Sequence, residues 1–357
     1  MSTSAIPPWF ELKLAGTALS EAMLPHLNRV EMSEAVSTLD TITIEFSVPM
    51  TAARYDLIKT LKAVPGQDYS FKCGSAGKES KEYTGIIMTV AHSLSRDSML
   101  KITLTGVDEL VKLKNARLPQ AEGWETLKAA LDKMATDANI KGGVELVDFQ
   151  ATEKPIFQEG KEDLKFIADF ARVNGFALRV VDTKLKFIPL AVDHAGSAQT
   201  VAWDSDLVSM GITTDISDVY GKAQAVTYDS KTAEDVTVDA DKSTLKTISK
   251  GKTGAEYASV PFGDRLILLP NKVDQESSQL TQETEGKLQE SNMKFLKGSM
   301  TLYGRPDVYA GSTIEVTDGY WPFKGVFFAE QVKHTIAPGA GFKTTVTIAS
   351  DSLPPEP

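Results

Sequence analysis

The sequence predicts a mainly β protein in which two related β-domains flank a mixed α+β domain. Three observations predict this fold class: strand-like alternation towards both ends of the chain, helical spacing between residues 116 and 202, and a repeated motif. Alternating apolar and polar residues indicate strands with one buried face, whereas apolar residues three and four apart indicate helices.

The repeated motif occupies residues 83–105 and 323–347. Each copy begins aromatic-X-Gly-aliphatic, continues to a histidine, and has a lysine nine residues later, just before a Thr-apolar-Thr run. The matched residues are Gly85, His92 and Lys101 in the first copy and Gly325, His334 and Lys343 in the second, with two extra residues between Gly325 and His334. The copies are either two unrelated amphipathic hairpins or an internal duplication of a β-domain.

Residues 1–115 are expected to form the first β-domain. Ile42, Ile44 and Phe46 alternate with polar residues up to Pro49, which predicts a half-buried strand. Residues 51–66 are expected as a short helix or a loop. The run GSAGKES at 74–80 lacks the glycine spacing of a phosphate loop and is expected as a hairpin turn, beside a buried Cys73.

Residues 116–202 are expected to form the α+β domain. A first helix follows Gly123, because Trp124, Leu127, Leu131, Met134 and Ala135 share one face. A second helix over 164–173 stops at Asn174-Gly175. The strands FALRVV and KLKFIPL then flank a turn at Asp182-Thr183.

The second β-domain is expected to be discontinuous, comprising residues 203–230 and 297–357. Residues 231–296 are expected as an insertion that packs on the middle domain. Its first part, 231–254, is rich in Thr, Asp and Lys and is predicted as a long loop. Residues 272–296 are predicted as a helix with a narrow apolar stripe, solvated on most sides.

The composition argues against several classes of function. The chain has 357 residues and a formal net charge of −10, which disfavours binding nucleic acid by charge neutralisation. A single cysteine, Cys73, allows no disulfide within the chain. The first residues do not read as a signal peptide and no apolar run has the length of a membrane span, so we expect synthesis in the cytoplasm.

No residue pattern predicts catalysis, a metal or a cofactor. The four histidines, His26, His92, His194 and His334, are far apart in the sequence. Glu153, Glu159, Glu162 and Asp163 offer carboxylates for acid–base chemistry. Glu162 and Asp163 are better explained as acids that favour the first turn of a helix.

The second copy of the motif carries a family resemblance. It runs Gly304-Arg305-Pro306, Gly311 before a strand, Gly325, and Val332-Lys333-His334 at the end of a strand. This order resembles that of phage tail baseplate hub proteins of the late control gene D family, and of the hub part of type VI spike proteins. The Asp40-Thr41-Ile42 strand start and the helix-then-strand unit at 162–180 are similar to the same family.

The resemblance implies a structural protein without cofactors. It implies two tail-tube-like β-barrel domains per chain and a homotrimer, whose six domains adapt a sixfold tail tube to a threefold spike. The implied partners are the tail tube protein, a central spike protein and baseplate wedge proteins, within a phage, a tail-like bacteriocin or an injection system. The alternatives are a tail-associated peptidoglycan hydrolase and a glycan-binding β-module that stacks sugars on Tyr320 and Trp321.

Overall fold

The structure is a computed structural model that describes residues 8–50, 61, 63–75, 77–96, 98–114, 124–140, 142–146, 158, 160–181, 184–190, 198–273 and 277–355. Several sequence predictions lie outside these residues. They are the helix or loop over most of 51–66, the Asp182-Thr183 turn, His194, and the carboxylates of Glu153 and Glu159.

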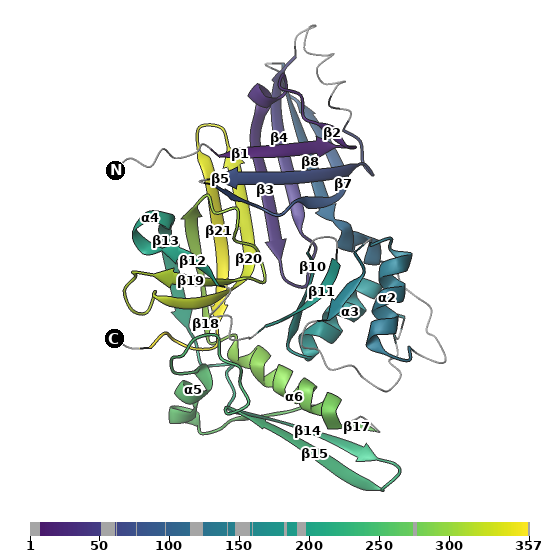
Figure 1. The fold of residues 1–357 in the computed structure, drawn as a ribbon, viewed down its shortest axis with the longest axis vertical. Coiled ribbons are helices and arrows are strands. Elements are labelled where there is room, and N and C mark those ends of the chain that lie inside the picture. The colour runs from purple at the N-terminus through teal and green to yellow at the C-terminus, as the bar shows by residue number, and fades with distance from the viewer. Residues whose placement is uncertain are drawn as a thin grey trace.

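One curled sheet of fourteen strands runs through both ends of the chain (Figure 1). The N-terminal strands are β1 (Trp9–Leu14), β2 (Thr17–Ala18), β3 (Leu27–Ala35), β4 (Thr41–Pro49), β5 (Asp68–Ser75), β6 (Lys78–Glu79), β7 (Tyr83–Leu94) and β8 (Met99–Asp108). The later strands are β12 (Gln199–Ala202), β13 (Leu207–Thr214), β18 (Leu296–Tyr303), β19 (Thr313–Thr317), β20 (Gly325–Ala337) and β21 (Gly341–Ser350). The mainly β fold class is therefore confirmed.

The main path through this sheet is β13-β18-β21-β20-β3-β4-β8-β7-β5-β1-β2, with β19 beside β20, β12 beside β19 and β6 beside β5. Its concave side is apolar because the strands alternate as predicted: Ile42, Ile44 and Phe46 are buried on β4. Cys73 is buried, and Gly74 pairs with Glu79 and Ser75 with Lys78, as expected for a hairpin between β5 and β6.

A small α+β unit packs beside the sheet (Figure 1). It contains the 3-10 turn η2 (Glu109–Leu113), α2 (Leu127–Asp137), β9 (Val144–Leu146), α3 (Asp163–Val173), β10 (Phe176–Val181) and β11 (Lys184–Pro189). The Thr126 hydroxyl accepts a hydrogen bond from the Ala129 amide and so caps the start of α2. Asn174 and Gly175, whose φ is +78°, end α3 as predicted. Both helices pack their apolar faces against the sheet β10-β11-β9.

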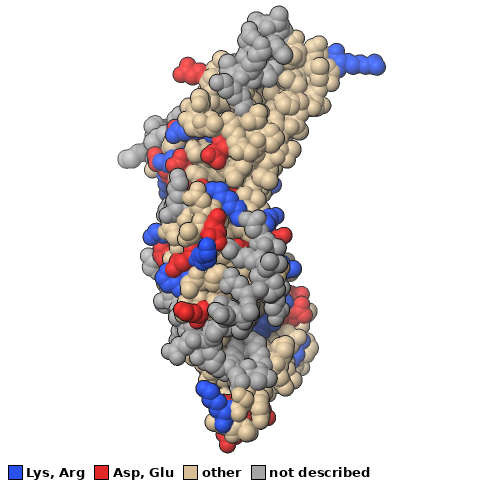
Figure 2. Space-filling model, turned by 90° about the vertical axis from the view of Figure 1, so that its right-hand side faces the viewer, with Lys and Arg blue, Asp and Glu red and all other residues tan. Residues whose placement is uncertain are grey.

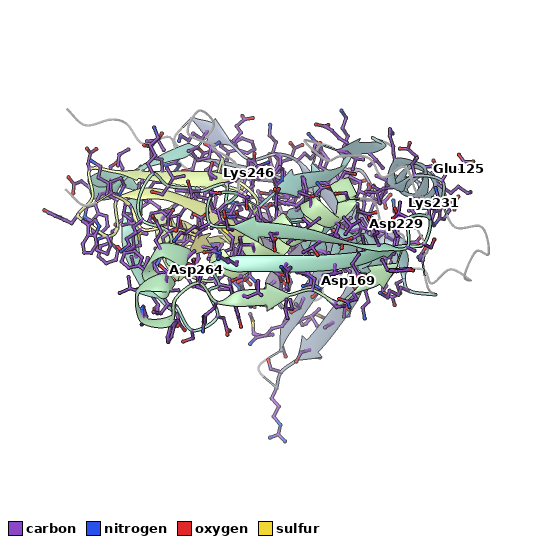
Figure 3. All side chains as sticks on the ribbon, turned by 90° about the horizontal axis from the view of Figure 1, so that it is seen from below. Glu125, Asp169, Asp229, Lys231, Lys246 and Asp264 are labelled. Atoms are coloured by element: carbon purple, nitrogen blue, oxygen red, sulfur yellow. The ribbon has the colours of Figure 1, made fainter. Side chains whose placement is uncertain are left out.

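A second small sheet lies at the end of the molecule remote from the first strands. It is built from β14 (Lys222–Asp229), β15 (Glu234–Asp241), β16 (Leu266–Leu268) and β17 (Lys272–Val273), with α5 (Gly254–Phe262) and α6 (Ser277–Asn292) beside it. The remaining short elements are η1 (Leu24–His26) and α4 (Trp203–Asp206). Figure 3 shows the β14–β15 hairpin from below, with Asp229 and Lys231 at its turn and Asp264 towards the other end.

Two predictions for this region are wrong. The segment 231–254 is not simply a long loop, since it contains β15, where Val236, Val238 and Ala240 alternate with exposed residues. The alternation is easily overlooked in the sequence because its apolar residues are small and separated by acids. The helix α6 exists, but it is not solvated on most sides.

Polar residues of α6 are buried because they find hydrogen-bond partners. The Asn292 amide donates to the Tyr220 carbonyl at 3.1 Å, and the Gln289 amide donates to the Asp351 carboxylate at 3.0 Å. The Thr284 hydroxyl donates to the Leu280 carbonyl one turn back at 2.6 Å. A helix with a narrow apolar stripe is thus enclosed by hydrogen bonds as well as by apolar contact.

We expect Gly286→Ala to destabilise the protein. Alanine normally favours a helix interior by about 1 kcal/mol over glycine. Here a Cβ would lie 2.5 Å from the Asn174 backbone carbon, so α6 and the end of α3 would have to separate. The free energy of unfolding, measured by denaturant titration, should fall by about 1–3 kcal/mol. Ser278→Ala on the exposed start of the same helix is the control; a more stable G286A protein would contradict this packing.

Candidate functional site at the junction of two sheet repeats

The two motif copies form hairpins with the same register. In β7–β8, Ser93 pairs with Lys101, and in β20–β21, Thr335 pairs with Lys343. Each hairpin has one irregularity, between Ile87 and Thr89 in β7 and between Ala329 and Gln331 in β20. The extra residue therefore lies four positions before the histidine in both copies. A β-bulge at the same place favours duplication over two unrelated hairpins.

The likeness extends to the whole sheet. The strand order β3-β4-β8-β7-β5-β1 is repeated as β13-β18-β21-β20-β19-β12. A second shared bulge lies at the start of β3, between Leu27 and Arg29, and of β13, between Leu207 and Ser209. One pairing differs, because β1 and β5 are antiparallel whereas β12 and β19 are parallel. We call β1–β8 the first repeat and β12, β13 and β18–β21 the second repeat.

The repeats join where β20 pairs with β3. Val332 pairs with Glu34 and His334 with Met32, in an antiparallel register that runs from Gln331 to Ile336. Upstream of its bulge, β20 pairs with β19 instead. The bulge thus marks the point at which β20 leaves its own repeat and enters the other.

An ion cluster is buried at this junction. Arg179, on β10 of the α+β unit, donates to the Glu34 carboxylate and to the Ala310 carbonyl, and lies 2.9 Å from Asp40 Oδ2. The Arg179 side chain is 1% exposed and that of Glu34 is fully enclosed. Glu34 belongs to the first repeat and Ala310 to the second, so one guanidinium connects three parts of the chain.

Further groups neutralise Glu34. Lys81 Nζ lies 3.1 Å from Glu34 Oε2, and the Tyr83 hydroxyl donates to Glu34 Oε1 at 2.5 Å. Burial alone would raise the pKa of Glu34, but Lys81 and Arg179 lower it to about 2. Glu34 is therefore a carboxylate at neutral pH.

Two further acids surround the cluster. Burial raises the pKa of Asp40, opposed by the charge of Arg179. Burial, and then the charge of Asp40, raise the pKa of Asp108 well above its usual value. Met32, Tyr83 and Val180 complete a small cavity beside these groups.

His334 is a buried part of the junction. Its Nδ1 lies 3.1 Å from the Thr344 hydroxyl, and its Nε2 lies 3.1 Å from the Val308 carbonyl. Since a carbonyl only accepts, Nε2 carries the proton and Nδ1 accepts from Thr344. Burial lowers the pKa of His334, so the ring is neutral.

Arg305 anchors the loop that covers the junction. It makes two hydrogen bonds of 2.9 Å to Asp307 and one of 2.8 Å to Asp206. Lys78 of the first repeat reaches Asp307 at 2.9 Å. Pro306 lies in the turn between these residues, as its place in the motif predicts.

The other marker residues occupy turns and close contacts. Gly311 has φ +85° in the turn before β19. A Cβ at Gly85 would lie 1.9 Å from the Val107 carbonyl oxygen, and one at Gly304 would lie 2.3 Å from the Phe342 ring. Gly325 begins β20; because the bulge and histidine coincide, it lies two residues before the structural equivalent of Gly85.

His92 is exposed, unlike its counterpart His334, and Lys101 and Lys343 are both exposed. Of the motif residues singled out from the sequence, some therefore lie in the buried junction and others at the surface. Sequence reasoning missed Glu34, Lys81 and Arg179. One signal was present: Glu34 follows Leu27, Val30 and Met32 in the buried phase of β3.

The cluster is suited to holding the chain together. Its charged groups are paired and enclosed, and within the described ranges there is no group of three or more His, Cys, Asp and Glu residues placed to bind a metal. Glu162 and Asp163 lie at the start of α3, consistent with a role in helix initiation. None of the helices in the described part of the chain is both long and apolar enough to span a membrane.

A sequence model of the family described as Alg8 N-terminal domain matches residues 8–338. The chain belongs to this family. Its description names a domain and no activity, and the specific resemblance to the late control gene D group stays a prediction. No curated protein matches the sequence.

Solved structures show a shared fold at low sequence identity. A tail protein from Neisseria meningitidis MC58 is 15% identical with a TM-score of 0.68, over 97% of both chains. The 43 kDa tail protein of prophage MuSo2 from Shewanella oneidensis is 14% identical with a TM-score of 0.63, over 97% of this chain and 99% of that one. The E. coli c3393 protein, a type VI secretion component, is 14% identical with a TM-score of 0.54, over 96% of this chain and 77% of that one.

Removing the buried guanidinium should strongly destabilise the fold. Arg179→Met removes the guanidinium from Glu34 and from the Ala310 carbonyl, and breaking a buried pair in this way costs about 3–5 kcal/mol. The matched control is Arg172→Met, whose half-exposed guanidinium pairs with Glu290 at 3.0 Å and should contribute about 1 kcal/mol or less. Equal losses in the two variants, measured by denaturant unfolding, would refute a central role for Arg179.

Neutral His334 should make part of the stability pH-dependent. Below a pH of about 6.5 the unfolded chain binds a proton that the folded protein still excludes. The contribution is fully present above that pH and falls as pH drops towards the lower pKa of the folded state. The difference in unfolding free energy between wild type and His334→Gln should therefore shrink from pH 7 to 5. His92→Gln, at the exposed counterpart, is the control; a difference that grew on acidification would oppose a neutral ring.

Proposed function

We propose that the protein is a structural hub of a contractile-tail baseplate. The observation that carries the proposal is the duplication of one strand arrangement within a continuous sheet. The fold shared with a tail protein, a prophage tail protein and a type VI secretion component supports it. A late control gene D type of hub is the specific form that we propose.

The duplication suits a symmetry adaptor. Three chains with two similar β-units each give a ring of six units with threefold symmetry. Such a ring presents six comparable surfaces to a tail tube and three to a central spike. We propose the tail tube protein, the spike protein and baseplate wedge proteins as partners, with the protein made in the cytoplasm and assembled into the particle.

The site chemistry favours this role over the alternatives. A peptidoglycan hydrolase needs accessible acids, whereas the acids of the junction are buried and engaged with Arg179 and Lys81. For a glycan-binding module, Tyr320 is exposed, but it packs edge-on against Trp203, and the Trp321 indole donates to the Pro354 carbonyl. These contacts are those of aromatic residues that hold a loop.

Light scattering on a sizing column tests the proposal directly. We expect a mass near three times 38.7 kDa for the protein alone, or a complex that contains three copies of this chain after addition of a central spike protein. Imaging should then show a ring with threefold symmetry and six similar lobes. A protein that stays monomeric with the spike protein present would contradict the hub. Cleavage of purified peptidoglycan by the protein would support the hydrolase instead.

A further inference from the structure

The two strands that meet at the junction within the chain each have an equivalent in the other repeat. In the second repeat, β20 uses its segment after the bulge to pair with β3 of the first repeat. The equivalent of β20 is β7, and the equivalent of β3 is β13. Among the described residues, no strand pairs with the segment of β7 after its bulge, other than β8, or with the outer edge of β13. The two edges that could form a second junction of this kind are therefore both unpaired in the described part of the single chain.

Side chains at the internal junction are more buried than the side chains at equivalent positions on β7 and β13. Ile336 on β20 is 8% exposed, whereas its equivalent on β7, Leu94, is 63% exposed. Met32 on β3 is 1% exposed, whereas its equivalent on β13, Ile212, is only half-buried. Residues covered in the internal junction are therefore accessible on β7 and β13 in the single chain.

Both free edges lack the usual protection against pairing. Edge strands of soluble proteins commonly carry charged residues or proline, which discourage association with another strand. Neither Met88–Leu94 nor Leu207–Thr214 contains Lys, Arg, Asp, Glu or Pro. At the far end of the sheet, by contrast, β1 carries Glu11 and Lys13. Figure 2 shows few charged side chains over the upper part of the molecule, where the first repeat lies.

We propose that β7 of one chain pairs antiparallel with β13 of a second copy, extending the sheet across the chain boundary. The internal junction pairs His334 with Met32 and Ile336 with Val30. Transfer through the shared bulges gives the register of the new junction: His92 opposite Ile212, and Leu94 opposite Met210. The inference rests on the proposed trimeric hub and names its contact residues.

The two edges are complementary and different, so the contact is head-to-tail. Each chain offers one β7 edge and accepts on one β13 edge, and contacts of this kind close into a ring when the rotation permits. In this proposal, two repeats from different chains are related by the same rotation as the two repeats within one chain. Three copies with one internal and one external junction each give a closed sheet of six repeats.

The external junction differs in chemistry from the internal one. The equivalent of buried Glu34 is Thr214, and the equivalents of the Lys333–Glu31 ion pair are Ala91 and Gly211. Backbone hydrogen bonds and small side chains therefore hold the chains together. The ion cluster belongs to the internal junction, because Arg179 lies against Glu34 there.

Disulfide cross-linking tests the register. In the proposed pairing Ala91 faces Thr213, and both side chains are exposed in the single chain, so Ala91→Cys/Thr213→Cys should fold normally. Facing residues of antiparallel strands are about 4.5–5.5 Å apart at Cα, within reach of a disulfide. Mild oxidation should give a covalent trimer on a non-reducing gel. The control Ala91→Cys/Gly211→Cys is shifted by two residues and should not cross-link, and native Cys73 is buried.

The outcomes separate this inference from the hub itself. A trimer by light scattering without cross-linking of the 91/213 pair would overturn the edge pairing and leave the hub standing. Cross-linking of the shifted pair alone would overturn the register. A monomer at every concentration, with and without the spike protein, would overturn both proposals.

A charge placed on the edge gives an independent test. Leu94→Asp should reduce the mass of the trimer to that of a monomer, with the melting temperature of the monomeric fold unchanged, because Leu94 is exposed in the single chain. Leu268→Asp on β16 is the matched control, since this leucine is 68% exposed but lies on the small sheet. A Leu94→Asp protein that remains trimeric at the same concentration would contradict the inference.

Discussion

The pairing of β20 with β3, closed by the enclosed Glu34–Arg179 pair, is the contact on which the rest of the structure depends. It joins two sheets into one, and it brings Arg179 of the α+β unit against residues from both ends of the chain. A buried carboxylate is tolerated there only because a guanidinium, an ammonium and a phenol all reach it. The cluster helps to specify which edges meet, since Glu34 on β3 is the acid that faces this arginine.

The same strand arrangement is used twice with different results. In the second repeat the segment after the bulge is covered, and His334 is buried with its ring nitrogens bonded to Thr344 and Val308. In the first repeat the corresponding segment is bare, and His92 is exposed. The bulge explains how one strand serves two sheets: it redirects the strand from its own repeat to a neighbouring edge. The two copies differ because β3 lies beside β20, whereas no strand of the described residues lies at the equivalent edge of β7.

Hydrogen bonds and ion pairs of polar side chains hold several parts of this chain in place. The helix α6 is enclosed through Asn292 and Gln289, and its Gly286 lets the backbone approach the end of α3. Arg305 holds the loop before β19 in a similar way, with carboxylates on either side. Parts of the chain outside the main sheet are thus fastened by specific hydrogen bonds, which fix orientation as well as position.

The sequence by itself determined the local elements and the existence of a repeat. Period-two alternation located β4, helical spacing located α2 and α3, and the spacing from histidine to lysine identified two matching hairpins, because these signals depend only on neighbouring residues. It failed at β15 and at the surroundings of α6, where small or polar residues are buried by partners distant in the chain. The ion cluster, the joining of the repeats into one sheet and the difference between His92 and His334 were decided by the tertiary structure alone. Each depends on which strand edge comes to lie against which, and residues 145 positions apart, such as Glu34 and Arg179, carry no local trace of one another.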